Sequence, residues 1–355
     1  MNLINTFFEN ISHRIDKNIS ISNESSSLFR MILSLYLFLF IDRDVIWLSY
    51  VPETLYNPLY LNISRVLGSF PPKYFLVFCT YLNLICMLCI GLGAKTRFFS
   101  RLYVLLFIIT SSFTYSFGKI DHGILLPITI LCLSFSNWST LYALLPDKTS
   151  PYHIKSYHVL ALCLVFGMAS AGLGKLIVWL DFDLNTNGFL SWFYQRYFSI
   201  NSRYLLADIV FHFPPILLEG FDYAGIIFEL SAMFFLLKSK KSWLIWLISA
   251  ITFHITNTLL LNIPFWANSI LYFSFIIGHY KPNIKQIHVR VFHLIITSTF
   301  FILLYQKLFL SIKKSFLLFD KTTISTNTYL IMMLVLWTLL LIVSIKALFK
   351  KQKLT

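Results

Sequence analysis

The chain has 355 residues, of which 57% are hydrophobic and only 12% are charged, and its formal net charge is +14. Ordinary soluble domains are about 45–50% apolar, whereas here apolar windows of about 17–25 residues, the length needed to cross a bilayer, recur almost end to end. This pattern excludes a sizeable soluble domain and predicts an all-α polytopic membrane helix bundle. The basic residues stand singly or in small groups between the apolar windows, as loop charges do in membrane proteins, so we expect membrane lipids and not nucleic acid as partners.

Residues 1–27 contain no short apolar core followed by a small-residue cleavage site, so we expect a cytoplasmic N-terminal segment and not a removable signal peptide. The five cysteines all lie within apolar windows, which favours buried thiols over disulfides or a metal site. Nucleotide-binding glycine motifs, HExxH and GxSxG are absent from the sequence.

In chain order, the apolar windows predict about ten spanning helices. They are expected at residues 29–49, 75–94, 101–118, 123–143, 157–180, 223–238, 242–261, 264–280, 290–311 and 327–349. The third and fourth, and the seventh and eighth, are separated by the very short stretches GKIDHG and LNIP, each of which is a hairpin or a kink.

Lysine and arginine accumulate in cytoplasmic loops, and here they follow alternate helices. They cluster at residues 95–101, 238–241, 281–290 and 346–353. This distribution predicts that both termini are cytoplasmic. The opposite, outer side then carries residues 50–74, 119–122, 181–222 and 312–326.

Ionisable groups inside spanning helices are costly and are functional candidates by default. Four places in the sequence qualify, namely Lys119 with Asp121 and His122, then Lys175, then Glu229, and finally His254 with Asn257 and Asn262. On the predicted topology several of these groups lie near the outer side. We expect them to meet in an outward-facing polar cavity, where a desolvated lysine is able to act as a base.

Structural explanations compete with these roles. Lys119 is explained equally by snorkelling to the interface and Asp121 by capping the next helix. Lys175 is one turn from Trp179 and close to Asp181, so snorkelling or pairing with Asp181 is the alternative to a base. His254 also suits an interhelical hydrogen bond, and Glu229 also suits a buried Glu–Lys or Glu–His pair that holds helices together.

The order of several motifs resembles the horizontally transferred transmembrane domain family, which includes the membrane part of vitamin K-dependent gamma-glutamyl carboxylase. The motifs are LFRMILSLYLFLFIDRD, GLGAKTRFFSRLYVLL, YSFGKIDHGILLPITILCLSFSNW, GLGKLIVWLDFDLNTNGFLS, an intramembrane glutamate, and FHITNTLLLNIPFWANSILYF. The resemblance spans roughly residues 28–280. Residues 281–355 are expected to add two further helices and a basic tail, in place of the large lumenal domain of the carboxylase.

The resemblance implies roles for particular residues. Lys175 is similar in motif position to the lysine base of the carboxylase, and His122 to a histidine in its asparagine–histidine hairpin, with Asp121 here in place of the asparagine. Phe253, His254 and Asn257 match its Phe-His-x-x-Asn element.

The resulting expectation is a carboxylase-like integral membrane enzyme, in a bacterial inner membrane, that uses a lysine base and a reduced quinone of the vitamin K type. In this interpretation Lys175, His122, His254 and Glu229 are catalytic, and Asp121, Asn257 and Asn262 bind the substrate, which is small, lipidic or a peptide. A non-enzymatic transporter or a partner-binding scaffold, for instance in peptide maturation or export, remains the alternative.

Overall fold

The computed structural model describes residues 2–41, 45–60, 62–117, 122–181, 183–280, 282–309 and 325–349. Within these residues no β-strand forms, and one isolated bridge pairs Ala94 with Leu145. The predicted all-α membrane helix bundle is therefore confirmed. The chain divides into two compact units, which are described separately, and each unit draws on more than one part of the sequence.

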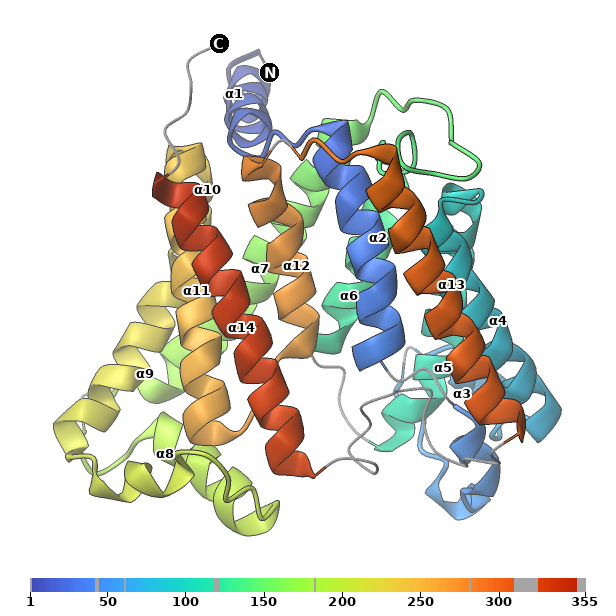
Figure 1. The fold of residues 1–355 in the computed structure, drawn as a ribbon. Coiled ribbons are helices and arrows are strands. Elements are labelled where there is room, and N and C mark those ends of the chain that lie inside the picture. Colours follow the sequence, from blue (N-terminus) through green and yellow to red (C-terminus); the bar gives the residue numbers. More distant parts are fainter. Residues whose placement is uncertain are drawn as a thin grey trace. The chain divides into compact units, whose positions relative to one another are not determined.

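Unit 1 consists of residues 1–20, 158–280 and 325–355. Its helices are α1 (Asn2–Asn18), most of α7 (His153–Trp179), α8 (Gly188–Tyr194), α9 (Pro215–Leu230), α10 (Ala232–Lys238), α11 (Lys240–Leu261), α12 (Trp266–Ile276) and α14 (Thr326–Phe349). Helix α14 packs along α11 and α12, and Figure 1 shows α11 and α14 side by side. Shorter π- and 3₁₀-helical turns at Gln195–Ser199, Ala207–His212 and Ile277–His279 complete the unit.

Unit 2 consists of residues 21–157 and 281–324. Its helices are α2 (Asn23–Phe40), α3 (Ser64–Leu67), α4 (Lys73–Leu92), α5 (Thr96–Thr114), α6 (Leu125–Leu133) and α13 (Gln286–Phe309), with 3₁₀ turns at Ile46–Tyr50, Glu53–Leu55, Tyr115–Phe117 and His122–Ile124. Helix α13 packs on α2 and α4 (Figure 1), so the last two helices of the chain belong to different units.

Among the described residues, six helices are long and apolar enough to span a membrane, and a seventh results if α9 and α10 form one span bent by 45°. The chain is thus an integral membrane protein. The six are α4, α5 with its 3₁₀ extension to Phe117, α7, α11, α13 and α14. Each coincides with a predicted span.

The predicted span at 223–238 falls within the bent pair of α9 and α10, whereas those at 29–49, 123–143 and 264–280 correspond to helices that are shorter than expected or begin with polar residues. Helix α2 has 18 residues, and its first turn is the polar stretch NESSS. Helix α6 has 9 residues and α12 has 11, against the roughly 20 that a bilayer needs. The LNIP stretch does separate two helices, because Asn262 and Phe265 both adopt left-handed backbone conformations there.

The core of unit 2 contains Arg30, whose side chain is fully buried. Its guanidinium donates hydrogen bonds to the carbonyls of Ile90 and Gly91 at the end of α4, both at 2.7 Å, and to those of Trp138 and Tyr142. A cation is favourable at a helix C-terminus, and these four carbonyls engage four of the five guanidinium donors. Arg30 therefore holds α4 and the loop that follows α6 together.

Candidate functional site

The site whose residues are best suited to carry out a reaction lies in unit 1, where α7 meets α9. Near the C-terminal end of α7, Lys175 points its ammonium group at Glu229 of α9, and Nζ donates a hydrogen bond to Oε1. The Lys175 side chain is 23% exposed and that of Glu229 only 5%. The structure thus combines two of the sequence-predicted site residues into a nearly buried ion pair.

Aromatic rings surround the ammonium group. Nζ of Lys175 lies 5.3 Å from the ring centroid of Trp179 and 5.9 Å from that of Phe253. Both distances fall in the range in which a cation is attracted to an aromatic face. The ammonium therefore has one anionic partner and two apolar walls.

A glycine gives Trp179 its position. A Cβ built on Gly188 would lie 2.2–2.4 Å from three atoms of the Trp179 indole, so the start of α8 rests directly on the ring. The carboxylate of Asp222 fixes that contact, because it accepts hydrogen bonds from the backbone N–H groups of Gly188 and Phe189, both at 2.8 Å. Asp222 thereby holds α8 against Trp179, and Trp179 against Lys175.

The loop between α7 and α8 is ordered by its own polar side chains. Asp181 accepts hydrogen bonds from the Thr186 hydroxyl at 2.6 Å and from the Asp183 N–H at 3.0 Å. These bonds, with that from Thr186 the larger influence, hold the pKa of the Asp181 carboxyl below its usual range. Asn187 ends the loop as the N-cap of α8 and accepts a hydrogen bond from Leu190 N–H at 2.8 Å. The Asp181 carboxylate therefore forms its hydrogen bonds within the loop, and Lys175 pairs with Glu229 instead of Asp181.

His254 lies on α11 next to Phe253 but faces a different group of side chains. Its Nε2 is hydrogen-bonded to the Tyr272 hydroxyl at 2.9 Å. Its ring lies 4.5 Å from that of Phe265 and 5.1 Å from that of Trp337, centroid to centroid. This aromatic packing joins α11, α12 and α14. The hydrogen bond to Tyr272 connects two helices, as the structural alternative for His254 predicts.

Asn257 in α11 and Asn262, the residue that caps this helix, both form hydrogen bonds at its C-terminal end. The backbone carbonyl of Asn257, a buried residue, accepts the N–H groups of Asn262 and Ile263. The Asn262 amide exchanges two hydrogen bonds with the Tyr204 backbone, both at 3.0 Å. Asn262 therefore fastens the loop before α9 to the end of α11, and a substrate-binding role for either asparagine stays a prediction.

Lys119 and Asp121 lie outside the described residues, and of His122 the structure describes only the backbone, at the start of a 3₁₀ turn. Their roles stay predictions.

Sequence reasoning did not connect Lys175 with Phe253, which lies beside its ammonium group, or with Gly188 and Asp222, which act on the site through Trp179. The span expected from the sequence begins at residue 223, which leaves Asp222 in the preceding loop, whereas α9 begins at Pro215 and Asp222 is fully buried within it. The sequence does contain a signal that Asp222 belongs to the same helix face as Glu229. The two residues are seven apart, and residues with that spacing share a face of a helix.

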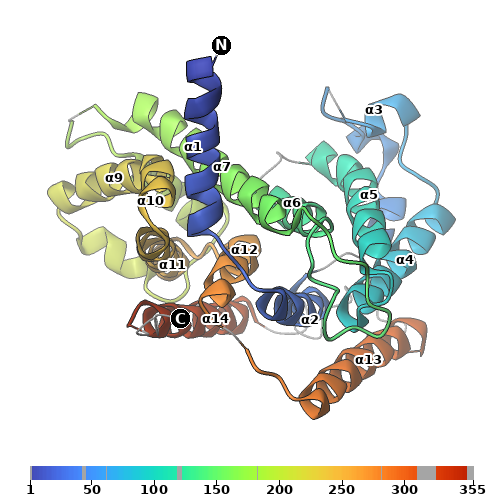
Figure 2. The same ribbon diagram turned by 90° about the horizontal axis from the view of Figure 1, so that it is seen from above.

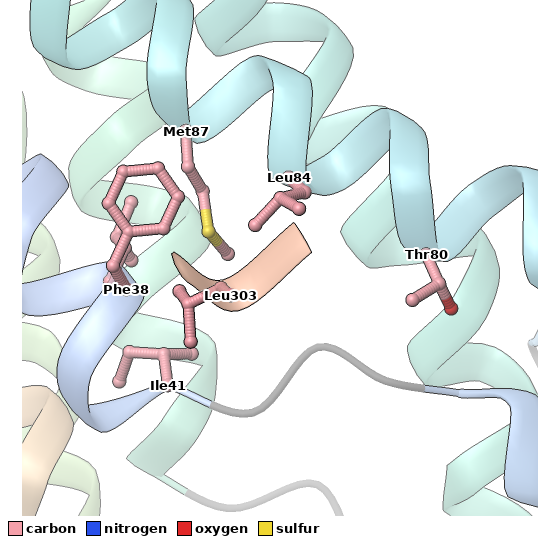
Figure 3. A pocket seen from close by; sticks show the side chains of 7 residues that line it. Phe38, Ile41, Thr80, Leu84, Met87 and Leu303 are labelled. Carbon is pink, nitrogen blue, oxygen red and sulfur yellow. The ribbon is translucent and has the colours of Figure 1, made fainter. Parts of the chain in front are cut away.

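A pocket in unit 2 has a different character (Figure 3). It is lined from α2, α4 and α13 by Leu37, Phe38, Ile41, Thr80, Leu84, Met87 and Leu303. The one hydroxyl in this lining, that of Thr80, accepts a hydrogen bond from Val45 N–H at 3.4 Å. Apart from this hydroxyl the lining is apolar and contains no acid or base, so the pocket is a weaker candidate for catalysis than the Lys175 site.

Among the described residues, no group of three or more His, Cys, Asp or Glu side chains is arranged to hold a metal ion. Comparisons of the chain with protein-family models, with curated proteins and with solved structures find no match.

Proposed function

We propose that the chain is a carboxylase-like membrane enzyme of the horizontally transferred transmembrane domain type, in which Lys175 is the base and Glu229 its proton partner. The observation that carries this proposal is the pairing of the two groups in a nearly buried, aromatic-walled site. The proposal includes a bacterial inner membrane, cytoplasmic termini and a small, lipidic or peptide substrate.

The ion pair has a direct consequence for the chemistry. A neighbouring carboxylate favours the charged ammonium, and an ammonium is not a base. Transfer of one proton from Lys175 Nζ to Glu229 Oε1 gives the neutral amine, which then accepts a proton from an acidic group of the substrate. Glu229 holds the first proton until the cycle returns it. Both groups are therefore needed, and their low exposure limits exchange with water.

The residues around Lys175 fit a reduced quinone. Trp179 and Phe253 give the site an aromatic, apolar lining of the kind that favours a flat ring, and Lys175 offers a polar group that binds a hydroxyl. When bound, a hydroquinone would supply an acidic hydroxyl and two reducing electrons. Trp179 and Phe253 would orient it and exclude water, and Lys175 would take the proton at Nζ.

The test uses purified protein in nanodiscs with a vitamin K hydroquinone, carbon dioxide and oxygen, and it measures consumption of the hydroquinone. We expect consumption in the wild type and its loss in Lys175→Arg, because a guanidinium keeps its charge but does not release a proton in proteins. Loss is also expected in Glu229→Gln. Consumption that survives Lys175→Arg would refute the role of Lys175 as a base.

A transporter is the second candidate, and one observation favours it. Helix α9 carries Glu219 and Asp222 in addition to Glu229, and all three are buried. Both carboxyl oxygens of Glu219 lack a hydrogen-bond partner within the described part of the chain. Rows of buried acids in membrane helices are typical of ion and proton pathways. Proton flux into proteoliposomes that tolerates Lys175→Arg and is lost in Glu219→Gln would favour the transporter over the enzyme.

A further inference from the structure

Helix α1 has a pronounced two-sided character. Phe7, Phe8, Ile11 and Ile15 recur at helical spacing on one side, while Glu9, His13, Asp16 and Lys17 occupy the other. It runs crosswise to the spanning helices of unit 1. Figure 2 shows α1 lengthwise where α11 is seen end-on, whereas Figure 1 shows α1 end-on where α11 and α14 run lengthwise.

The C-terminal half of α1 is docked on unit 1. Ile15 is 1% exposed, and the Asn18 amide donates a hydrogen bond to the carbonyl of Leu236 in α10 at 2.8 Å. Asp16 pairs with Nδ1 of His158 on α7 at 2.7 Å. These contacts fix the direction of the helix relative to α7 and α10.

The N-terminal half continues beyond this contact with its apolar side uncovered. Phe7 is 59% exposed and Phe8 is 62% exposed. Phe8 and Ile15 are two helical turns apart and therefore point in similar directions. The side that Ile15 buries against protein is thus the side on which Phe8 is exposed to the environment of the protein.

The charges at this end of unit 1 indicate what that environment is. Arg14 and Lys17 on α1 are exposed, as are Lys238 at the end of α10 and Lys241 at the start of α11. Lys240 donates to the Ser20 carbonyl at 3.1 Å, which places the end of the N-terminal segment beside the start of α11. Of the two acids on α1, Asp16 is already paired with His158, and only Glu9 is exposed against four exposed basic residues. The exposed charge is therefore mainly positive and complements an anionic surface.

We propose that α1 is an interfacial helix that lies in the lysine-rich leaflet, with Phe7 and Phe8 inserted at the boundary between headgroups and acyl chains, and with Arg14, Lys17, Lys238 and Lys241 on anionic lipid headgroups. Amphipathic helices that combine inserted aromatic residues with basic residues at the level of the headgroups bind membranes in this way. Basic residues near an anionic surface add electrostatic attraction to the apolar insertion. The inference is independent of the function proposed for the Lys175 site.

The test is spin labelling of the full chain in nanodiscs, with the five native cysteines replaced by alanine. Nitroxides are placed in Phe8→Cys and, as the matched control on the polar side, in Glu9→Cys. Accessibility to oxygen, which concentrates in lipid, is compared with accessibility to a water-soluble nickel complex. We expect the oxygen-to-nickel ratio to be severalfold higher at position 8 than at position 9, and we expect the difference to shrink when anionic lipid is replaced by zwitterionic lipid.

Three results would overturn the proposal. Equal nickel accessibility at both positions would mean that α1 lies in water. A label at position 8 that is immobilised and protected from both reagents would mean that protein, either a partner or a second copy, covers the helix. A ratio that does not respond to lipid charge would remove the role of the basic residues.

Discussion

The pairing of Lys175 with Glu229 predicts a strong energetic coupling, which a double-mutant cycle measures. The cycle comprises Lys175→Met, Glu229→Gln and the double variant, and each substitution removes a charge with little change of volume. Removing one partner of a buried ion pair costs about 3–5 kcal/mol, because it leaves an uncompensated charge. Since 23% of the Lys175 side chain is exposed, its ammonium regains some hydration when Glu229 is neutral. We therefore expect about 2–3 kcal/mol for Glu229→Gln.

The opposite substitution leaves the more buried partner alone. The Glu229 side chain is 5% exposed, so Lys175→Met is expected to cost at least as much, about 3 kcal/mol. The double variant contains no isolated charge and is expected to cost less than the sum of the two, by about 1–3 kcal/mol.

The assay is unfolding by sodium dodecyl sulfate in mixed micelles, followed by circular dichroism, with free energies taken from two-state transitions. Lys175→Arg is the matched control, since it keeps a cation that pairs with Glu229, and its stability is expected to stay closest to that of the wild type. Additivity of the two single substitutions within about 0.5 kcal/mol would refute the pairing.

Three further predictions concern the surroundings of this pair and the core of unit 2. Gly188→Ala is expected to lower the midpoint of thermal unfolding and to displace Trp179 from Lys175, because the added Cβ would lie 2.2 Å from the indole. Gly174→Ala is the control: its Cβ meets no atom of the described residues within 4 Å, so it should be neutral or stabilising in the same thermal unfolding measurement. Arg30→Lys is expected to cost about 2–4 kcal/mol, since an ammonium cannot reproduce a fork that serves four carbonyls; unfolding in mixed micelles measures it, and an unchanged midpoint would contradict it. The pKa of Asp181 is lower in the folded than in the unfolded chain, so its contribution to the order of residues 183–187 is complete above about pH 4 and is lost as the pH falls further. A spin label at position 184 should gain mobility in acid, and the same label in Asp181→Asn should already be mobile at neutral pH.

Hydropathy and composition were sufficient to predict the helical membrane bundle and all six long spans. They failed where polar side chains end a helix inside an apolar window. Residues 123–143 were expected to span, yet α6 ends at Leu133, because Ser134 and Ser136 donate their hydroxyls to the carbonyls of the last helical turn and Asn137 accepts the N–H of Ser150. A window average counts the apolar residues of this stretch but does not register the competing hydrogen bonds.

The pairing of the site residues depended on contacts that sequence spacing does not encode. The sequence offered both Asp181 and a buried glutamate as partners of Lys175. Asp181 is close in the chain, but the turn it forms with Thr186 occupies its carboxylate, and the partner is Glu229, 54 residues away. His254 likewise finds Tyr272 and Trp337 on two other helices. Local patterns identified the ionisable residues, whereas tertiary packing selected their partners.

Helix α9 positions both the carboxylate that pairs with Lys175 and the carboxylate that holds α8 against Trp179. Asp222 and Glu229 lie two turns apart on one buried face, so a single rigid element sets both the anion beside Lys175 and the backbone of α8 that supports Trp179. The helix ends at Leu230, and a bend of 45° separates it from α10. Any motion at this bend would move both carboxylates together, so that the ion pair and the Trp179 wall would loosen or tighten in concert. For this reason Asp222→Asn is expected to change the accessibility of Lys175 to an amine-reactive reagent, although Asp222 does not touch the lysine. Unchanged labelling of Lys175 in that variant, read by peptide mass spectrometry, would show that the two carboxylates act separately.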